Sequence, residues 1–286
     1  MSTKHSYSQR PARFLVPSLI ACCGLGAAEN ADPIVIAGEQ TLPYQEAVVG
    51  AASKTGAPLL EVPQSTSVIT AEQIDRQGLS DFGQAFRYTP GVQGENFGFE
   101  PRTTFLRLRG FDAFEDGYFR DGMQMANPDF VVGYGPEPYG AERIEVLRGP
   151  ASVLYGQGAP GGLVNYVDKT PQWHARHEMI GTVGNHERLQ ARFDSTAAIG
   201  ESEELAYRVI GLLRDSESQV DFIGEERLYL APSLSWRPSP ASTWTVFGHY
   251  QQDATSPSQR LPAAAGSTRV PGDAGILSTL QRAEVV

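Results

Sequence analysis

The sequence predicts an α+β domain followed by an antiparallel β-sheet, and two patterns support this prediction. Up to Pro171, short apolar runs alternate with helix caps and glycine-rich turns, which is typical of mixed α+β domains. From His177 onward, apolar and polar residues alternate with a period of two, which indicates strands with one apolar face. The 286 residues leave room for one large domain or two.

Residues 1–28 have the composition of a secretory signal peptide. Three basic residues precede an apolar stretch of small residues that ends at Ala28, where cleavage is expected. The sequence therefore predicts export from the cytoplasm. A lipoprotein signal stays open as an alternative, because Leu-Ile-Ala precedes Cys22. Both cysteines lie in this segment, so no thiol chemistry is expected in the rest of the chain.

Residues 29–61 are expected to form a flexible arm, since no hydrophobic period is sustained and three prolines interrupt them. The first helix of the folded domain can be placed by its cap. Thr70 and Gln73 form a capping box, which predicts a helix through Gln77. A second helix is expected to start at Ser80.

The remainder of the α+β domain shows strands, turns and closely spaced glycines. Arg102–Gly110 alternates as a strand, and Asp121-Gly122 is typical of a tight hairpin turn. Two strand-like runs, Ile144–Leu147 and Leu163–Val167, flank a glycine-rich segment. Glycine accepts a positive φ and lets a second backbone approach, so these positions predict tight turns against a packed neighbour. The glycines are Gly149, Gly156, Gly158, Gly161 and Gly162.

Three of these glycines, Gly156, Gly158 and Gly161, also spell the G-x-G-x-x-G pattern of dinucleotide-binding proteins. That pattern binds a pyrophosphate only where it follows a strand and opens a helix. Here Gly162 leads into a strand-like run, whereas the alternative of a nucleotide-binding enzyme requires a helix after Gly162. Nucleic acid is not expected as a partner, because the net charge is −10.

About five strands are predicted after the α+β domain, each with one apolar row. In the third of these strands Arg208 and Arg214 stand in the polar row. Trp236, Trp244 and Tyr250 lie near strand ends, as in the aromatic girdles of membrane barrels. A soluble sheet with one wet face fits the period equally well. The strands are His177–Val183, Arg188–Thr196, Leu205–Arg214, Arg227–Trp236 and Thr243–Gln251.

Six segments occur in the order that is found in one family of outer-membrane proteins. They are VPQSTSVITAEQI (62–74), YTPGV (88–92), LRLRGF (106–111), FRDGM (119–123), ERIEVLRGP (142–150) and VLYGQGAPGGLVNYVDKTP (153–171). Through them the chain resembles the TonB-dependent outer-membrane receptors, most closely the ferric-siderophore group. The resemblance implies an α+β plug domain over 62–171, then an incomplete antiparallel transmembrane β-barrel over 172–255.

The family closes its barrel with many more strands than the five predicted here. Residues 256–286 are expected to form an irregular tail, since Ile276–Val286 shows no strand alternation. An open sheet leaves unpaired edges that hydrocarbon cannot satisfy. We therefore expect this chain to be a truncated product or a fragment.

The resemblance implies a receptor in the cell outer membrane, surrounded by its lipid, that imports a ferric siderophore. TonB, with ExbB and ExbD, would drive the import, and the receptor would act as a monomer. Iron would be carried by the siderophore, with no cofactor or metal held by protein side chains. A periplasmic module that binds TonB without transport is the alternative function. Cobalamin and haem are alternative ligands.

The resemblance also assigns roles to particular residues. Asp32-Pro33-Ile34-Val35-Ile36 resembles the TonB box, which pairs with TonB as an added strand. Arg109 and Arg148 occupy motif positions whose arginines pair with barrel glutamates and so latch the plug. Those glutamates would lie beyond Val286. Ordinary surface pairing with Asp112 or Glu145 is the alternative for these arginines.

The segment with Phe97, Phe99 and Arg102 resembles the plug loops that touch the ferric ligand. Aromatic rings and a guanidinium suit an anionic, partly aromatic iron chelate. No catalytic residues are assigned, because no serine or histidine stands in a nucleophile setting and the paired glutamates fall in predicted turns. The sequence therefore predicts a binding and transport protein and not an enzyme.

Overall fold

The computed structural model describes residues 63–96, 98, 100, 102–125, 134–149, 152–156, 158–200, 204–218, 223–239, 241–255 and 283–285. The predicted signal peptide, the arm with residues 32–36, and Phe97 and Phe99 lie outside the described residues. Among the helices in the described part of the chain, none is both long enough and apolar enough to cross a membrane.

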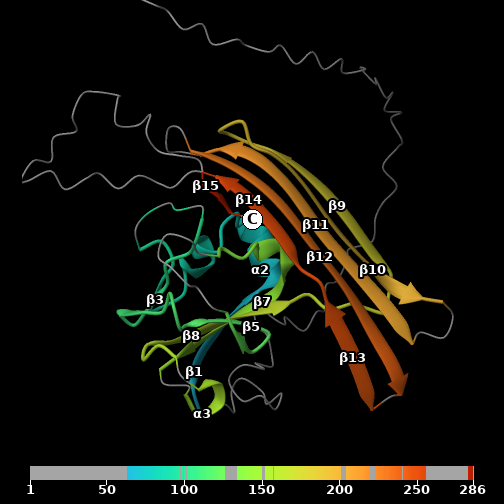
Figure 1. Ribbon diagram of the computed structural model, residues 1–286, viewed down its shortest axis with the longest axis horizontal. Helices are drawn as coiled ribbons and strands as arrows, with labels where there is room; N and C mark the ends of the chain where they lie inside the picture. The colour runs from blue at the N-terminus through green and yellow to red at the C-terminus, as the bar shows by residue number, and fades with distance from the viewer. Residues whose placement is uncertain are drawn as a thin grey trace, which may run out of the picture. The chain divides into compact units, whose positions relative to one another are not determined.

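The α+β domain that is expected to be the plug, called the plug below, is built on a five-stranded sheet in the order β1-β7-β8-β5-β6 (Figure 1). The predicted strands on either side of the glycine-rich segment are confirmed, and they pair with each other as antiparallel β7 and β8. A strand after Gly162 contradicts the nucleotide-binding alternative, which needs a helix there. The strands are β1 (Ser65–Thr70), β5 (Tyr118–Arg120), β6 (Met123–Gln124), β7 (Ala141–Arg148) and β8 (Gly162–Asp168).

The first predicted helix is confirmed as α2 (Ala71–Gln77). The Thr70 hydroxyl accepts a hydrogen bond from the Gln73 amide at 3.2 Å, as a capping box requires. Gly78 ends the helix in a left-handed conformation. The predicted turn at Asp121-Gly122 is also confirmed, since both residues have positive φ and join β5 to β6.

Two local predictions differ from the structure. Instead of a helix starting at Ser80, there is a short 3-10 helix, η2 (Gly83–Phe86). The Asp81 carboxylate accepts a hydrogen bond from the Gly83 amide at 2.6 Å, and this local bond forms a turn that replaces the first turn of the expected helix. The strand expected over Arg102–Gly110 is reduced to β3 (Arg107–Leu108). Residues 103–106 bond elsewhere: the Thr104 carbonyl accepts from the Tyr118 hydroxyl at 3.0 Å.

The remaining short elements connect these strands. β3 pairs with β2 (Val92–Gln93) and β4 (Phe111–Asp112) in a three-stranded sheet, and α3 (Ser152–Tyr155) lies in the glycine-rich segment. The 3-10 helix η3 (Pro138–Gly140) leads into β7. The plug core gathers apolar side chains from most of these elements, including Ile74, Phe82, Phe86, Leu106, Leu108, Ile144, Val146 and Val164.

The second sheet holds seven antiparallel strands in the order β15-β14-β12-β11-β10-β9, with β13 also paired to β12. Four of the five predicted strands are confirmed within a few residues. The fifth is split in two, with Gly248 and His249 between the parts. The strands are β9 (Arg176–Val183), β10 (Leu189–Ile199), β11 (Leu205–Glu217), β12 (Gly224–Ser239), β13 (Ser242–Phe247), β14 (Tyr250–Thr255) and β15 (Ala283–Val285).

The division of the fifth strand has a cause in its neighbour. β13 pairs with β12 up to Ser233, and β14 resumes the pairing at Leu230. Between them stands Pro232, which has no N–H to donate to the ladder. Its carbonyl accepts a single bond from the Gly248 amide at 2.8 Å. At the edge of the sheet, β15 pairs with β14. The tail over 256–286 was expected to be irregular, but its residues Ala283–Val285 form this strand.

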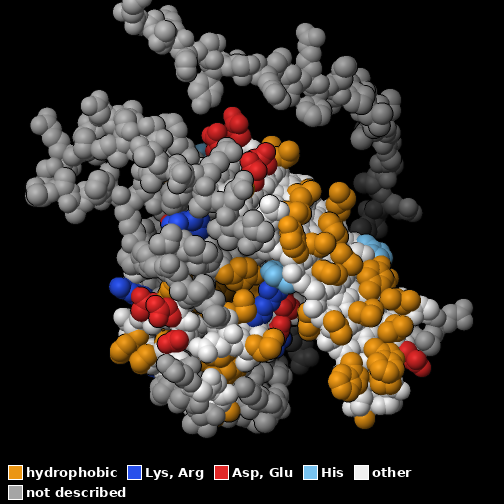
Figure 2. Space-filling model, viewed as in Figure 1, with side chains coloured by type: hydrophobic (Ala, Val, Ile, Leu, Met, Phe, Trp, Pro, Cys, Tyr) orange, Lys and Arg blue, Asp and Glu red, His pale blue; other side chains and the backbone are white. Residues whose placement is uncertain are grey.

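The apolar row of this sheet is exposed and its polar row is buried. Met179, Leu213 and Trp244 are 83%, 58% and 67% exposed, whereas Arg208 and Arg214 are 1% and 4% exposed. Apolar side chains cover these strands in Figure 2. A soluble sheet has the opposite arrangement, with its apolar face in the core. The sheet therefore presents a hydrocarbon-compatible surface.

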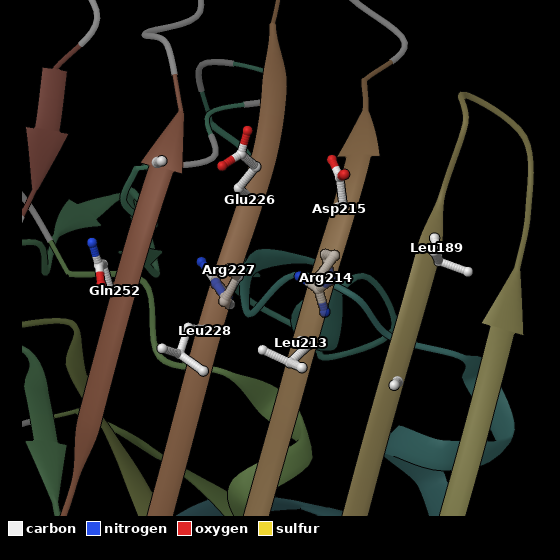
Figure 3. Close-up of a pocket in the computed structure, with 10 residues that line it drawn as sticks. Leu189, Leu213, Arg214, Asp215, Glu226, Arg227, Leu228 and Gln252 are labelled. Atoms are coloured by element: carbon white, nitrogen blue, oxygen red, sulfur yellow. The ribbon is translucent and has the colours of Figure 1, made fainter. Parts of the chain in front are cut away.

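A shallow groove of about 520 Å³ crosses this apolar face near one end of the strands. Leu189, Leu213 and Leu228 project into it from three neighbouring strands (Figure 3). Asp215 and Glu226, which stand opposite each other on β11 and β12, mark the point where the apolar row gives way to charges. The apolar band of the sheet thus ends at this level.

Candidate functional site

The candidate site is the contact between the plug and the polar row of β10, β11 and β12. At its centre lies Glu137 of the plug, whose side chain is 1% exposed. Its carboxylate binds Arg214 of β11 at 3.2 Å and Arg227 of β12 at 3.0 Å. Both arginines are almost fully buried. Because a buried charge is costly unless it is paired, these three residues hold the plug and the strands together.

The two arginines are satisfied by further partners on the strands. Arg214 donates to Glu225 at 2.6 Å and to Gln190 at 2.8 Å. Arg227 binds Asp253 of β14 through Nε at 2.5 Å. Arg214 also donates to a plug carbonyl, that of Ser80, at 3.0 Å. Such fully bonded networks are rigid, whereas the loss of one member leaves buried donors without an acceptor.

A second group of contacts lies where the plug chain passes into the strands. Asp194 of β10 accepts two bonds from Arg208 of β11, at 2.8 and 2.7 Å. Arg208 also donates to the Thr170 carbonyl at 2.9 Å. Lys169 lies 3.4 Å from Asp194 and 4.4 Å from the centre of the Tyr139 ring. Burial lowers the pKa of Lys169, and the Asp194 carboxylate opposes that shift.

The backbone of η3 approaches the strands closely. Gly140 has no side chain, and a β-carbon there would overlap the hydroxyl of Tyr229 on β12. Within the plug, the Tyr166 hydroxyl of β8 donates a hydrogen bond of 2.7 Å to the Glu137 carbonyl. The Gln251 amide of β14 donates to the Gly135 carbonyl at 2.9 Å. Residues 135–140 therefore form one segment of the plug that docks on the strands, and it is called the docking segment below.

The structure places the two predicted latch arginines beside each other but away from this docking segment. Arg148 is 9% exposed and donates to the Pro90 carbonyl at 2.7 Å and to the Ser67 hydroxyl at 2.8 Å. Arg109 is exposed and has a φ of 50°. Burial, and then the neighbouring Arg109 charge, lower the pKa of Arg148. Their pairing with barrel glutamates stays a prediction.

The alternative partners of these arginines are engaged elsewhere. Glu145 binds Arg143 at 2.7 Å and accepts from Asn165 at 3.1 Å. Asp112 accepts from the Phe114 amide at 2.9 Å. Both carboxylates therefore have partners other than Arg109 and Arg148.

Arg102 of the predicted ligand-contacting segment is bound to a carboxylate. Its Nε and Nη2 donate to Glu100 at 2.8 and 2.9 Å, and both side chains are largely buried. A chelate that uses the Arg102 charge would have to compete with Glu100 for it. The ligand role of this residue and of the two phenylalanines stays a prediction.

The sequence did not predict the role of Glu137. The described contact has a plug glutamate against strand arginines. It is a different contact from the predicted latch, which pairs plug arginines with barrel glutamates and stays a prediction. The positions of two strand arginines in the sequence do indicate a contact of this kind. Arg208 and Arg214 stand in mid-strand, in the row opposite an apolar row, where an unpaired charge would be costly. Such a residue predicts a buried partner from another segment.

Asp81 gives the plug a pH dependence of its own. Burial raises the pKa of this carboxyl to about 6, although the Gly83 amide opposes the shift. Between its ordinary pKa and about 6, the folded state holds a proton that the unfolded state has lost, so stability falls as pH rises through this window. Asp81→Asn should remove this part of the slope. Thermal unfolding of both forms from pH 4 to 7 measures it, and parallel profiles would contradict the assignment.

The comparisons with known proteins agree with this architecture. Residues 58–163 match the family TonB-dependent Receptor Plug Domain. The chain is 37% identical over 212 residues to the ferrioxamine B receptor of Salmonella typhimurium strain SL1344, covering 72% of this chain and 30% of that protein. It is 33% identical over 203 residues to the ferrichrome outer membrane transporter/phage receptor of Escherichia coli K12, covering 70% and 27%.

Solved structures show the same fold. The pyoverdine receptor FpvA of Pseudomonas aeruginosa, bound to pyoverdine, aligns over 76% of this chain and 32% of its own, with a TM-score of 0.69 and 21% identity. The siderophore receptor PiuA of Acinetobacter baumannii aligns over 74% and 30%, with a TM-score of 0.65 and 26% identity.

These matches define the class of the protein. The chain belongs to the TonB-dependent receptors of the outer membrane and contains their plug domain followed by antiparallel strands. Within that family it is similar to the ferric-siderophore group. The named relatives are transport receptors. The chain spans about 30% of the length of the curated relatives it matches.

Proposed function

We propose that the protein serves as a TonB-dependent receptor that imports a ferric siderophore across the outer membrane. The observation that supports this proposal best is the docking of the plug on the strands. A buried ion-pair network joins Glu137 to Arg214 and Arg227, and the opposite face of the same strands is apolar and exposed. The arrangement suits a stopper held inside a wall that faces lipid.

The substrate proposal comes from the relatives. Those named above are receptors for ferrioxamine B and for ferrichrome, so a ferric chelate of this kind is the first substrate to test. Iron would remain bound to its chelator and would need no protein ligand. TonB would supply the driving force together with ExbB and ExbD, and the receptor would work as a monomer. No catalytic step is assigned to the chain.

Deletion of residues 32–36 tests the coupling to TonB. We expect uptake of radioactive iron from ferrioxamine B to fall to the level of cells without the receptor, because the strand offered to TonB is lost. Binding of the chelate at the cell surface should be unchanged. A matched deletion of residues 52–56 shortens the same arm by the same length and should leave uptake intact. Normal uptake without residues 32–36 would remove the TonB-box assignment.

Cell fractionation separates transport from the alternative of a periplasmic TonB-binding module. The exposed apolar row of the sheet favours the membrane, since a soluble module would present that surface to water. We expect recovery in the outer-membrane fraction. Recovery in the soluble periplasm would favour the module.

A further inference from the structure

His249 forms a contact with the plug that is separate from the Glu137 network. It lies in the gap between β13 and β14, next to Gly248, which stands opposite Pro232 where the strand ladder is interrupted. Its Nδ1 is 3.2 Å from Nη2 of Arg120 on β5. Its Nε2 is 2.7 Å from the hydroxyl of Tyr134, which leads into the docking segment. One imidazole thus bridges two plug segments to the strands.

The partners of this ring determine where its proton lies. A guanidinium can only donate hydrogen bonds, so Nδ1 of His249 must accept the bond from Arg120. In the neutral ring the proton is therefore on Nε2, and it is donated to Tyr134. The Tyr134 hydroxyl also accepts from Nη1 of Arg120 at 3.2 Å. The three residues are satisfied only by the neutral imidazole with its proton on Nε2.

A second proton would reverse this contact. It would occupy Nδ1, so that two donors and two positive charges would face each other across 3.2 Å. The ring is exposed, so protons from solvent can reach it. Arg120 cannot give up its charge at physiological pH. The imidazole or the plug segment must then move.

The other ionisable groups around the ring do not offer it a replacement acceptor. The Arg120 guanidinium is held by Asp168 of β8, with Nε and Nη2 each 2.7 Å from a carboxylate oxygen, so both oxygens of Asp168 are already occupied by Arg120. Tyr229 of β12 meets the imidazole edge to face at 5.2 Å. Two further ionisable residues contact these partners of the imidazole. Asp121 accepts a hydrogen bond from the Asp168 amide, and the Arg120 guanidinium lies over the ring of Tyr166.

We propose that His249 is a proton-sensitive contact between the strands and the plug, closed when the imidazole is neutral and opened by protonation. Acidification would free the segments that carry Arg120 and Tyr134 from the strands on this side. The Glu137 network would still hold the docking segment. The inference depends on the docking geometry and is independent of which chelate is imported.

Two substitutions at this position separate the proton effect from the contact itself. His249→Asn keeps an acceptor for Arg120 on a side chain that does not titrate, whereas His249→Phe removes the contact at every pH. We expect wild type and His249→Asn to unfold at similar temperatures at pH 8. Between pH 8 and 5 the wild type should lose about 2–4 °C more than His249→Asn, the shift that corresponds to one modest contact in a chain of this size.

The control is His177→Asn, which changes another exposed histidine, one that contacts Ser195 at 2.9 Å on β10. This variant should keep the pH slope of the wild type. Nitrogen-15 NMR of histidine-labelled full chain gives a second readout, which should show the Nε2–H form of His249 at pH 8. Parallel pH profiles of wild type and His249→Asn, or a proton on Nδ1 at pH 8, would overturn the proposal.

Discussion

Replacement of Glu137 by glutamine is expected to destabilise the docked plug by about 3–5 kcal/mol, the typical cost of breaking a buried ion pair by removing one partner. Arg214 and Arg227 would keep their bonds to Glu225 and Asp253 but would lose the carboxylate between them. Glutamine has nearly the same volume as glutamate, so the substitution leaves no cavity. The loss of stability therefore measures the contribution of the charge. Urea unfolding of the purified protein measures the change in free energy.

Glu142→Gln is the matched control for this experiment. Its carboxylate is also on the plug and lies 3.7 Å from a strand arginine, Arg208, but its side chain is 40% exposed. An exposed pair of this kind contributes about 0–1 kcal/mol. Hydrogen exchange at residues 134–141 should rise in Glu137→Gln and stay low in Glu142→Gln. Equal losses of stability in the two variants would show that burial of the Glu137 pair is not what holds the plug.

Gly162→Ala is expected to cost about 3 kcal/mol or more, through strain and overlap together. Gly162 has a φ of 132°, which alanine rarely adopts, and a β-carbon there would overlap the Leu147 carbonyl and lie 2.9 Å from Arg148 Cα. These atoms belong to the backbone of β7, which pairs with β8 at this point. The two central strands of the plug would have to separate. Thermal unfolding measures the loss.

Gly78→Ala distinguishes the two causes. Gly78 has a φ of 61°, and a β-carbon at that position would have no neighbour within 4 Å. This variant therefore carries the strain of a left-handed residue alone, about 1–2 kcal/mol. If Gly162→Ala were no more destabilising than Gly78→Ala, the close approach of β7 to β8 would be of no consequence for stability.

In the contact between plug and strands, the carboxylate belongs to the plug and the arginines belong to the strands, and this distribution bears on the proposed role. In the described part of the plug, Glu137 is the one carboxylate that binds both Arg214 and Arg227, so the plug side of this contact depends on one side chain. Arg214 and Arg227 have further acceptors on the strands and remain partly satisfied when the plug moves. The strands can thus keep their own structure while the plug contact opens. This asymmetry suits a stopper that must stay in place until it is released.

Local features of this protein could be predicted from the sequence. The capping box of Thr70 and Gln73 defines α2, because cap and helix lie within one turn of each other. Asp121-Gly122 defines the turn between β5 and β6 for the same reason. The period-two pattern located the strands but not the side of the sheet that faces water, since a soluble and a lipid-facing sheet share that period.

Interactions between distant segments were decided only by the tertiary structure. Glu137 and Arg227 are 90 residues apart, and no local pattern relates their spacing to a shared bond. The break before His249 comes from Pro232 on the neighbouring strand, so it could be found only once the register of β12 was known. The sequence by itself determined most of the elements and the resemblance to the family. The packing of the plug on the strands determined which charges are buried, because burial depends on what each element meets across the fold.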